Sequence, residues 1–475
     1  MGDKTKIVNF VTISYHMGSK MEKTTGTGRQ LPEEFLQEME VTFGRDEAAG
    51  LAAALCDVPS VSLRVNRKKC SDPGLVAGRF EEFSPSPVPW CGSGFYLERR
   101  PDFVLDPLLH AGAYYVQEAA SMVYESIVSD VIKDGAAPSG RPMRVLDLCA
   151  APGGKSTAIL NALEGDYVLV ANEYDRRRGG ILRENLNKWG DPNVAVTFSD
   201  AKAFAALDGY FDIIAADAPC SGEGMMRREP AACSQWSPRL VEQCASLQRQ
   251  ILGDVLPALR PGGFLIYSTC TFNRIENEGN CRYLTEELGL EPLGEPRRFM
   301  PHRDRCEGLF VALFRKPDEN PGEANRRKRQ NKNSFIKPLN ENIFLNSDGL
   351  EFAVTGDRVL AMPPAVAETF RDLESAGIRP VSAGVEAGTV KGNLFTPSSR
   401  QLLSLLFDRE RLPLAAVSRE EALGFLRGQA IALPPGTPRG YVGIECEGYP
   451  LGLVKNIGNR ANNLYPKEWR IKTLK

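Results

Sequence analysis

The sequence has little histidine and no cysteines with metal-ligand spacing. Its 475 residues include three histidines, His16, His110 and His302, and eleven cysteines without a Cys-x-x-Cys or Cys/His cluster. Protein zinc sites need such clusters, so we expect no metal. A cysteine hydrolase needs a histidine partner, and only His302 lies in a motif-like segment, PHRDRCEGLF. The dispersed cysteines indicate a reducing compartment, in which most thiols are buried and one or two are reactive.

The chain also lacks long apolar runs and a strong net charge. No apolar run approaches the roughly 18 residues that span a bilayer, and the N-terminus has no secretory apolar core. We therefore expect a cytoplasmic protein, a monomer that binds no membrane. The net charge is −2, which gives no overall sign of nucleic-acid binding. Local basic clusters nevertheless predict a discontinuous track for RNA phosphates, at Arg64, Arg67, Lys68 and Lys69, at Arg176 to Arg178, and at Arg326 to Lys332.

The residue pattern divides the chain into segments of different character. LPEEFLQEME has a helical period that places Leu31, Phe35, Leu36 and Met39 on one face, and SVSLRVNRK alternates like a strand. These two patterns predict a small α+β domain before the middle of the chain. The predicted segments are an N-terminal extension (1–28), the small α+β domain (29–100), an α/β domain (101–317), a basic polar linker (318–334), an intermediate domain (335–392) and a β-rich module (393–475).

The middle segment alternates short apolar runs with helical stretches. The runs RVLDLCAA, YVLVANE, VAVTFSD, FDIIAADAP and FLIYSTC predict five strands, and helices are expected from Gly154, Arg176, Ser237 and Arg274. Strands of uninterrupted apolar character joined by helices predict a parallel sheet covered on both faces, hence an α/β fold. In such sheets ligands bind beyond the carboxyl ends of the strands.

The loop LCAAPGGKST after the first of these strands resembles a phosphate-binding Walker loop only at its end. A Walker loop needs a glycine five positions before Gly154, and this chain has Cys149 there. Small residues still let a ligand approach the backbone, and the helix that follows offers unpaired N–H groups. The predicted cofactor contacts in this loop are Cys149, Ala150, Ala151, Pro152, Gly153, Gly154 and Lys155.

Acidic residues at the next strand ends favour S-adenosylmethionine over ATP. Glu173 ends the second strand, where a carboxylate can accept both ribose hydroxyls of an adenosine. Asp200 ends the third strand, where it could meet the adenine amino group. Asp217 ends the fourth strand and completes the predicted cofactor residues. No Walker-B-like magnesium pair accompanies them, so ATP stays the weaker alternative.

Two cysteines follow neighbouring strand ends. Cys220 lies in DAPCSG after the fourth strand, and Cys270 lies in YSTCT after the fifth. Small or polar residues surround each cysteine where a core strand would have stayed apolar. Their position beside the cofactor loop indicates chemistry rather than packing.

Together these segments resemble the Nop/Sun family of RNA cytosine-C5 methyltransferases. The resemblance covers YYVQEAASM, LDLCAAPGGK, NEYDRRR, DAPCSGEGMMRR, YSTCTFNRIENE and PHRDRCEGLFVALFRK. It implies a Rossmann-like, S-adenosylmethionine-dependent methyltransferase domain that acts on RNA. SLRVNRKK and GNRANNLYPKEW resemble the branch that methylates small-subunit ribosomal RNA. That branch implies an RNA-binding N-terminal domain, a PUA-like C-terminal module, and as partner the small-subunit RNA or an assembling subunit.

The resemblance also implies catalytic roles. Cys270 is the implied nucleophile at cytosine C6, and Cys220 assists when the C5 proton leaves and the adduct breaks. Asp217 could hold the base through N3 and the exocyclic amine. Lys155 either assists electrostatically or is a surface lysine at a helix start.

Several alternatives stay open at this point. The target could be a tRNA, and a catalytically silent RNA-binding ribosome-assembly factor could keep the same fold. Tyr465 and Trp469 are candidates for stacking on bases, although aromatic residues near the end of a β-module are more often core.

Overall fold

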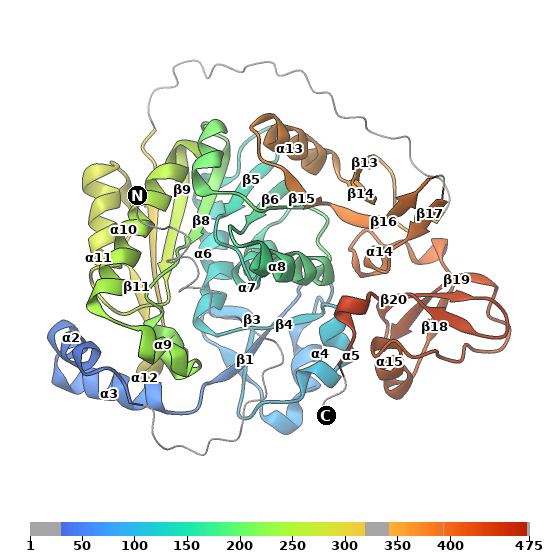
Figure 1. The fold of residues 1–475 in the computed structure, drawn as a ribbon, viewed down its shortest axis with the longest axis horizontal. Coiled ribbons are helices and arrows are strands. Elements are labelled where there is room, and N and C mark those ends of the chain that lie inside the picture. Colours follow the sequence, from blue (N-terminus) through green and yellow to red (C-terminus); the bar gives the residue numbers. More distant parts are fainter. Residues whose placement is uncertain (1–29, 319–341, 393, 473–475) are drawn as a thin grey trace.

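The computed structural model describes residues 30–318, 342–392 and 394–472. These residues form four sheets, of which the central one carries the middle of the chain (Figure 1). The predicted extension at 1–28 lies outside the described residues, and so do the linker from residue 319 onward and its basic run at Arg326 to Lys332.

The central sheet has nine strands in the order β10-β12-β9-β8-β5-β6-β7-β15, with β11 paired to β12 beside this path. Its parallel strands β9, β8, β5, β6 and β7 correspond to the five predicted strands. They are mostly buried, which explains their apolar sequences. The α/β prediction is thereby confirmed. The bounds are β5 (Met143–Asp147), β6 (Tyr167–Asn172), β7 (Val194–Thr197), β8 (Phe211–Asp217), β9 (Leu259–Thr269), β10 (Glu291–Pro292), β11 (Arg297–Phe299) and β12 (Leu309–Arg315).

Helices cover both faces of this sheet. One apolar core contains residues of α6 (Val123–Val131), α7 (Gly154–Ala162) and α8 (Arg176–Trp189), and another contains residues of α10 (Pro238–Val255) and α13 (Pro364–Ser375). Side-chain caps fix two of the starts, because Asp175 accepts from the first turn of α8 and Ser237 from that of α10.

The fourth predicted helix begins later than its expected start at Arg274. The helix α11 (Glu278–Arg282) starts after a turn in which the Asn273 side chain accepts the N–H of Glu276 at 2.8 Å. A side-chain bond of this kind offers the backbone an alternative to the helix. The short helices α9 (Pro230–Gln235) and α12 (Pro301–Asp304) lie in the connections around it.

The chain runs outward from β5 through β6 to β7, and then returns to the other side of β5 to form β8 and β9. The loops after β5 and β8 therefore diverge from adjacent strand ends. Such a switch point is where open α/β sheets bind their ligands.

The N-terminal part contains a small sheet of order β2-β3-β1-β4 and a separate helix pair. In the helix pair, Phe35 and Met39 pack with Trp236 of the predicted α/β domain, while Leu36, predicted on the same face, is exposed. It was wrong to include Leu36, because the buried stripe is narrower than the predicted one. Figure 1 shows this pair beside α9 and α12. The elements are α2 (Glu33–Phe43), α3 (Arg45–Cys56), β1 (Val61–Val65), α4 (Pro73–Gly78), β2 (Ser86–Val88), β3 (Cys91–Leu97), α5 (Pro107–His110) and β4 (Tyr114–Val116).

The predicted domain boundaries stay predictions, and strands pair across all three boundaries next to described segments. β4, in the segment 101–317, pairs with β1 of the N-terminal sheet. β15 (Pro380–Ala383), in the segment 335–392, pairs with β7 and lies at the edge of the central sheet. The rest of that segment contributes to a third sheet of β13 (Glu351–Thr355), β14 (Arg358–Met362), β16 (Val385–Lys391) and β17 (Leu394–Pro397).

The chain ends in a β-rich module, as predicted. Tyr465 and Trp469 are only 1% and 3% exposed and pack with Phe425 in its core. Their role is therefore packing, and the base-stacking alternative was wrong. The elements are α14 (Arg400–Leu403), β18 (Leu414–Ala416), α15 (Arg419–Leu426), β19 (Gly440–Cys446), β20 (Tyr449–Asn456) and β21 (Ala461–Asn463).

The first predicted basic cluster is largely internal. Arg64 has no exposed surface, and the Lys69 ammonium donates to the carbonyls of Ala111 and Lys188, both at 2.7 Å. Lys68 forms an ion pair with Asp191 at 2.7 Å. The cluster was wrongly predicted to be a phosphate-binding surface, because most of its cations join elements of the fold.

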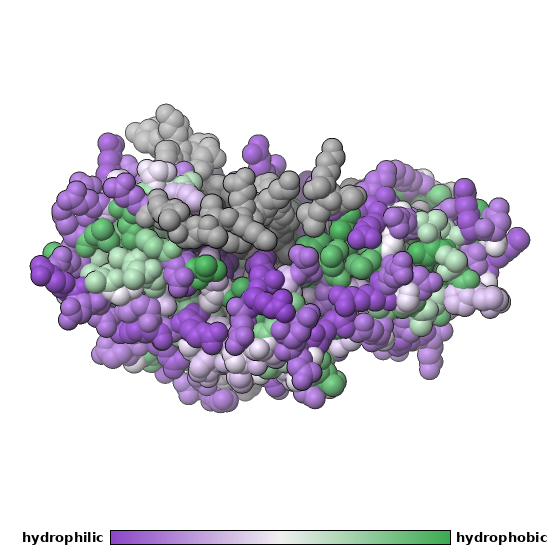
Figure 2. Space-filling model, turned by 90° about the horizontal axis from the view of Figure 1, so that it is seen from below, coloured by the Kyte–Doolittle hydropathy of each residue, from purple (hydrophilic) through white to green (hydrophobic). Residues whose placement is uncertain are grey.

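The surface is mixed in character. Figure 2 shows hydrophobic residues in separate patches among hydrophilic ones on the face seen from below. Within the described residues, no helix is long and apolar enough to cross a membrane.

Candidate active site

A cavity of about 1760 Å³ opens at the carboxyl ends of the parallel strands. It includes the switch point between β5 and β8, where a ligand is expected. Gly153 aside, every predicted site residue lines it: Cys149, Ala150, Ala151, Pro152, Gly154, Lys155, Glu173, Asp200, Asp217, Cys220 and Cys270.

The loop after β5 is held from the side of α8. Gly153 precedes α7 with φ +113°, a conformation that favours glycine, and a Cβ there would lie 3.3 Å from Leu182. Arg178 donates to the carbonyl of Ala151 and Asn185 to that of Pro152, both at 2.8 Å. Because both carbonyls already accept hydrogen bonds, the loop can bind a ligand mainly through the backbone N–H groups at the start of α7.

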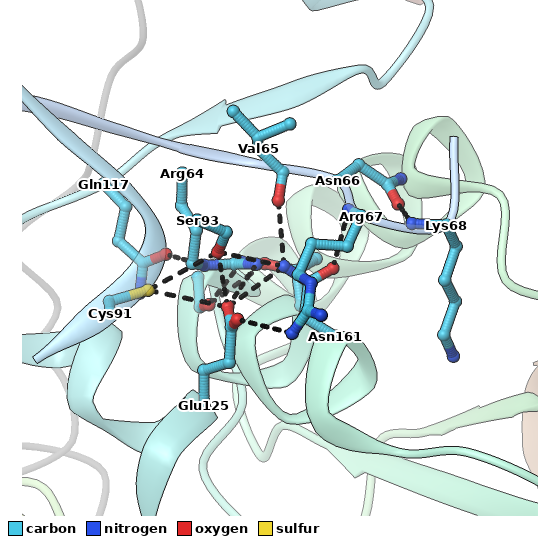
Figure 3. A network of polar contacts seen from close by, with 12 residues as sticks. Arg64, Val65, Asn66, Arg67, Lys68, Cys91, Ser93, Gln117, Glu125 and Asn161 are labelled. Carbon is cyan, nitrogen blue, oxygen red and sulfur yellow. Dashed lines mark hydrogen bonds and ion pairs between the residues drawn. The ribbon is translucent and has the colours of Figure 1, made fainter. Parts of the chain in front are cut away.

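The N-terminal sheet also contacts α7, the helix that follows the loop. Arg64 of β1 donates to Oγ1 of Thr157 in α7 at 2.6 Å and to Oε1 of Gln117 at 2.9 Å. Figure 3 shows Arg64 and Arg67 converging on Glu125, which also accepts from Asn161 of α7 at 3.0 Å. The small domain is therefore fastened to the cofactor helix by buried polar bonds.

Glu173 is buried and only partly bonded. One oxygen accepts the N–H of Asp175 at 2.9 Å, while Oε2 lacks a well-formed hydrogen bond among the described residues, with Arg178 3.5 Å away. Burial raises the pKa of Glu173, and the charge of Arg178 opposes this shift. A ligand that donates hydroxyl hydrogens fits such a carboxylate.

Asp200 also lines this cavity. Its carboxylate accepts the N–H of Lys202 at 3.1 Å and so begins the 3-10 helix η5 (Ala201–Ala206). The side chain is 38% exposed, so it remains accessible to a ligand.

Asp217 and Lys155 form a charged pair in the cavity. The two side chains are 2.8 Å apart, and Ser268 donates to the other Asp217 oxygen at 2.6 Å. Burial alone would lower the pKa of Lys155, but the charge and hydrogen bond of Asp217 outweigh it and raise that pKa. Lys155 is thus a fixed cation rather than a surface lysine.

The sequence did not reveal what holds Asp217 in place. The Tyr124 hydroxyl lies 2.8 Å from Oγ of Ser268, which in turn bonds Asp217. Ser268 is a polar residue near the end of a buried strand, and this position was the one sign in the sequence that it could belong to the site. Tyr124 lies in an apolar helical segment, and nothing in its local sequence indicated a role in the site.

The two cysteine sulfurs are 3.2 Å apart at the ends of neighbouring strands. The hydrogen bond to Cys270, together with burial, raises the pKa of Cys220 well above its usual value. At this separation either thiol can donate its hydrogen to the other sulfur.

The doubly wound sheet, the small-residue loop and the acidic strand ends together define an S-adenosylmethionine-dependent methyltransferase. Solved structures agree. A methyltransferase homolog protein from Pyrococcus horikoshii is 28% identical, with a TM-score of 0.52, and the match covers 61% of this chain and 96% of that one. NSun6 from the same organism, solved with SFG, shares the fold with a TM-score of 0.50 and 22% identity over 61% of this chain and 99% of that one.

Sequence comparisons narrow the class to a family. Residues 138–315 match 16S rRNA methyltransferase RsmB/F, residues 31–119 the N-terminal domain of 16S rRNA methyltransferase RsmF, and residues 414–471 the methyltransferase RsmF PUA domain. Ribosomal RNA small subunit methyltransferase F of Enterobacter sp. (strain 638) is 32% identical over 92% of this chain and 95% of the relative. The Escherichia coli O7:K1 protein of that name is 31% identical over 92% and 96%.

The chain therefore belongs to the RsmB/F family of ribosomal RNA methyltransferases. This membership confirms the predicted enzyme class, the S-adenosylmethionine cofactor, the RNA substrate and the PUA-like C-terminal module.

Proposed function

We propose that this ribosomal RNA methyltransferase modifies cytosine C5 in small-subunit RNA through a covalent bond from Cys270 to C6. The observation that supports this most is the 3.2 Å separation of the Cys220 and Cys270 sulfurs, in the cavity that also contains the Lys155–Asp217 pair. We also expect a monomeric, cytoplasmic enzyme.

The cofactor supplies the methyl group, and the residues that would hold it are the loop at 149–155, Glu173 and Asp200. Glu173 offers its incompletely bonded carboxylate oxygen to ribose hydroxyls, and Asp200 an accessible oxygen to the adenine amine. The start of α7 adds unpaired N–H groups.

The thiolate of Cys270 overcomes the low nucleophilicity of cytosine C5. Its sulfur bonds to C6, and the electron pair of the C5–C6 double bond moves to C5, which then accepts the methyl group. Asp217 would hold the polar edge of the base, and Lys155 holds the Asp217 side chain in position through their 2.8 Å contact.

Release reverses the first bond. C5 loses its proton to solvent water, the electron pair of that C–H bond restores the C5–C6 double bond, and the bond from C6 to Cys270 breaks with its electron pair on the sulfur. The thiol of Cys220, whose sulfur lies 3.2 Å from that of Cys270, can donate a hydrogen bond to the departing thiolate and so stabilise it.

Separate substitutions test these two roles. Cys270→Ala should neither methylate nor crosslink RNA, because no adduct forms. Cys220→Ala should accumulate a protein–RNA species that survives denaturing electrophoresis and disappears when Cys270 is also replaced. Cys56→Ala, at an exposed cysteine at the end of α3, is the matched control and should behave as wild type.

Two results would contradict the assignment. A trapped complex from Cys270→Ala with none from Cys220→Ala would place the nucleophile on Cys220. Intact methylation in both variants would reduce the two cysteines to packing.

A further inference from the structure

Two buried glutamates join the two cysteine loops. Each glutamate follows one cysteine in the chain and bonds the backbone of the loop that carries the other. Glu223 follows Cys220 in the chain, yet its Oε2 accepts the N–H groups of Phe272 and Asn273 on the Cys270 loop, at 2.6 and 3.0 Å. Glu276 follows Cys270, yet it accepts the N–H of Ser221 beside Cys220, at 3.1 Å to Oε2 and 3.3 Å to Oε1. Each carboxylate thus grips the backbone next to the opposite cysteine.

One amide ties the two carboxylates together. Nδ2 of Asn273 donates to Oε1 of Glu223 at 2.9 Å and to Oε1 of Glu276 at 2.8 Å. Gln248 of α10 donates to Glu276 at 2.6 Å, and the indole of Trp236 donates to Glu223 at 3.0 Å.

These carboxylates are costly to bury. Both glutamates have no exposed surface, and neither lines the cavity. Burial, with the charge of Glu223 added, raises the pKa of Glu276 to about 7. Apolar side chains of similar size would pack such a site at lower cost. The carboxylates supply what apolar residues cannot, which is directed bonds that fix one loop relative to the other.

We propose that Glu223 and Glu276 are positioning residues that form a reciprocal clasp and set the distance between the sulfurs of Cys220 and Cys270. Their effect on methylation rests on the proposed function of these cysteines. Loosening Glu276 displaces the Cys220 loop and slows release, so an adduct accumulates. Loosening Glu223 displaces the Cys270 loop and slows adduct formation.

Glu276→Gln and Glu223→Gln keep the side-chain shape but turn one acceptor oxygen into a donor that faces N–H groups. We expect kcat to fall about 10- to 100-fold, the range for a catalytic group misplaced by about 1 Å. The KM for RNA and the affinity for S-adenosylmethionine should change less than about threefold, because neither glutamate touches the cavity. Exposed Glu286→Gln is the matched control.

A second measurement needs no RNA. Diamide accepts two electrons and two protons from a thiol pair and leaves a disulfide, which mass spectrometry of the alkylated, digested protein detects. Wild type should form the Cys220–Cys270 bond rapidly, and both variants should form it about tenfold more slowly or worse. If neither variant folds, Gln248→Ala leaves both carboxylates in place and should slow the bond in the same direction.

A folded variant whose kcat and disulfide rate both stay within about twofold of wild type would overturn the clasp. Slower disulfide formation in the variants, with no RNA adduct from Cys220→Ala, would uphold the clasp and refute the proposed role of Cys220 in release. The two proposals therefore fail separately.

Discussion

Replacing Arg64 by methionine removes the buried cation that joins the N-terminal sheet to the cofactor helix. Arg64 is fully buried on β1, where it donates to Gln117 and Thr157 at 2.9 and 2.6 Å and lies 3.9 Å from a Glu125 oxygen. Arg67 reaches the other oxygen of Glu125 at 3.7 Å but is 55% exposed (Figure 3). The two arginines thus share one carboxylate and differ in burial.

The difference in burial sets the expected magnitudes. Arg64→Met forfeits two charge-assisted hydrogen bonds, each worth about 1.5–3 kcal/mol, and breaking a buried ion pair costs about 3–5 kcal/mol. These contributions overlap, so we expect a loss of about 3–5 kcal/mol in the free energy of unfolding. Arg67→Met should cost about 0–1 kcal/mol, as solvent-exposed pairs do.

Urea denaturation followed by circular dichroism measures both changes at the first unfolding transition. Calorimetry should also show weaker S-adenosylmethionine binding in Arg64→Met, because Thr157 lies in the first turns of α7. Arg64→Lys keeps the charge but not the forked donors, and should fall between wild type and methionine. Equal, small losses for Arg64→Met and Arg67→Met would refute the reasoning.

Two further predictions concern single buried charges. Glu173→Gln should weaken S-adenosylmethionine binding about 10- to 100-fold in calorimetry, since a hydrogen bond to a charged group is worth about 1.5–3 kcal/mol. Asp200→Asn should weaken binding less, because the Asp200 side chain is 38% exposed. Unchanged affinity in Glu173→Gln would exclude the contact between Glu173 and the ribose. Burial lowers the pKa of Lys69 from 10.5 to about 7. Between these two pKa values the unfolded chain binds more protons than the folded one, so the free energy of unfolding should rise from pH 7 to pH 9 in urea titrations. Lys69→Met should lose this rise. An unchanged pH dependence in Lys69→Met would contradict the assignment to Lys69.

The sequence contained enough to predict the centre of the fold. Apolar runs joined by helices leave few topologies, because crossovers between parallel strands are right-handed and both faces must be covered. β15 had no such signal. Its four residues, PVSA, are short and only moderately apolar, and their partner β7 precedes them by more than a domain's worth of chain. Edge strands of this kind are specified by tertiary packing rather than by local pattern.

The residues of the candidate site could be predicted where reactive or charged side chains follow the ends of strands. Glu173, Asp217 and the two cysteines interrupt apolar runs, and a parallel sheet brings its strand ends to one edge. The supports of the site were not predictable, because they come from other segments. Tyr124 and Glu223 are ordinary residues in their local sequence, and only the folded chain shows that their polar atoms bond Ser268 and the Cys270 loop.

The sequence shows which residues are charged but not which of them are buried. This difference decides which basic residues the enzyme can use to bind RNA. Arg64 and Lys69 looked like phosphate ligands, yet their donors are bonded inside the protein and cannot reach a phosphate. Among the described basic clusters, the exposed members are Arg67 and, at the start of α8, Arg176 and Arg177. Since counterion release follows the phosphates actually contacted, the salt dependence of RNA binding should reflect accessible cations such as these and not the larger number of basic residues that the sequence displays.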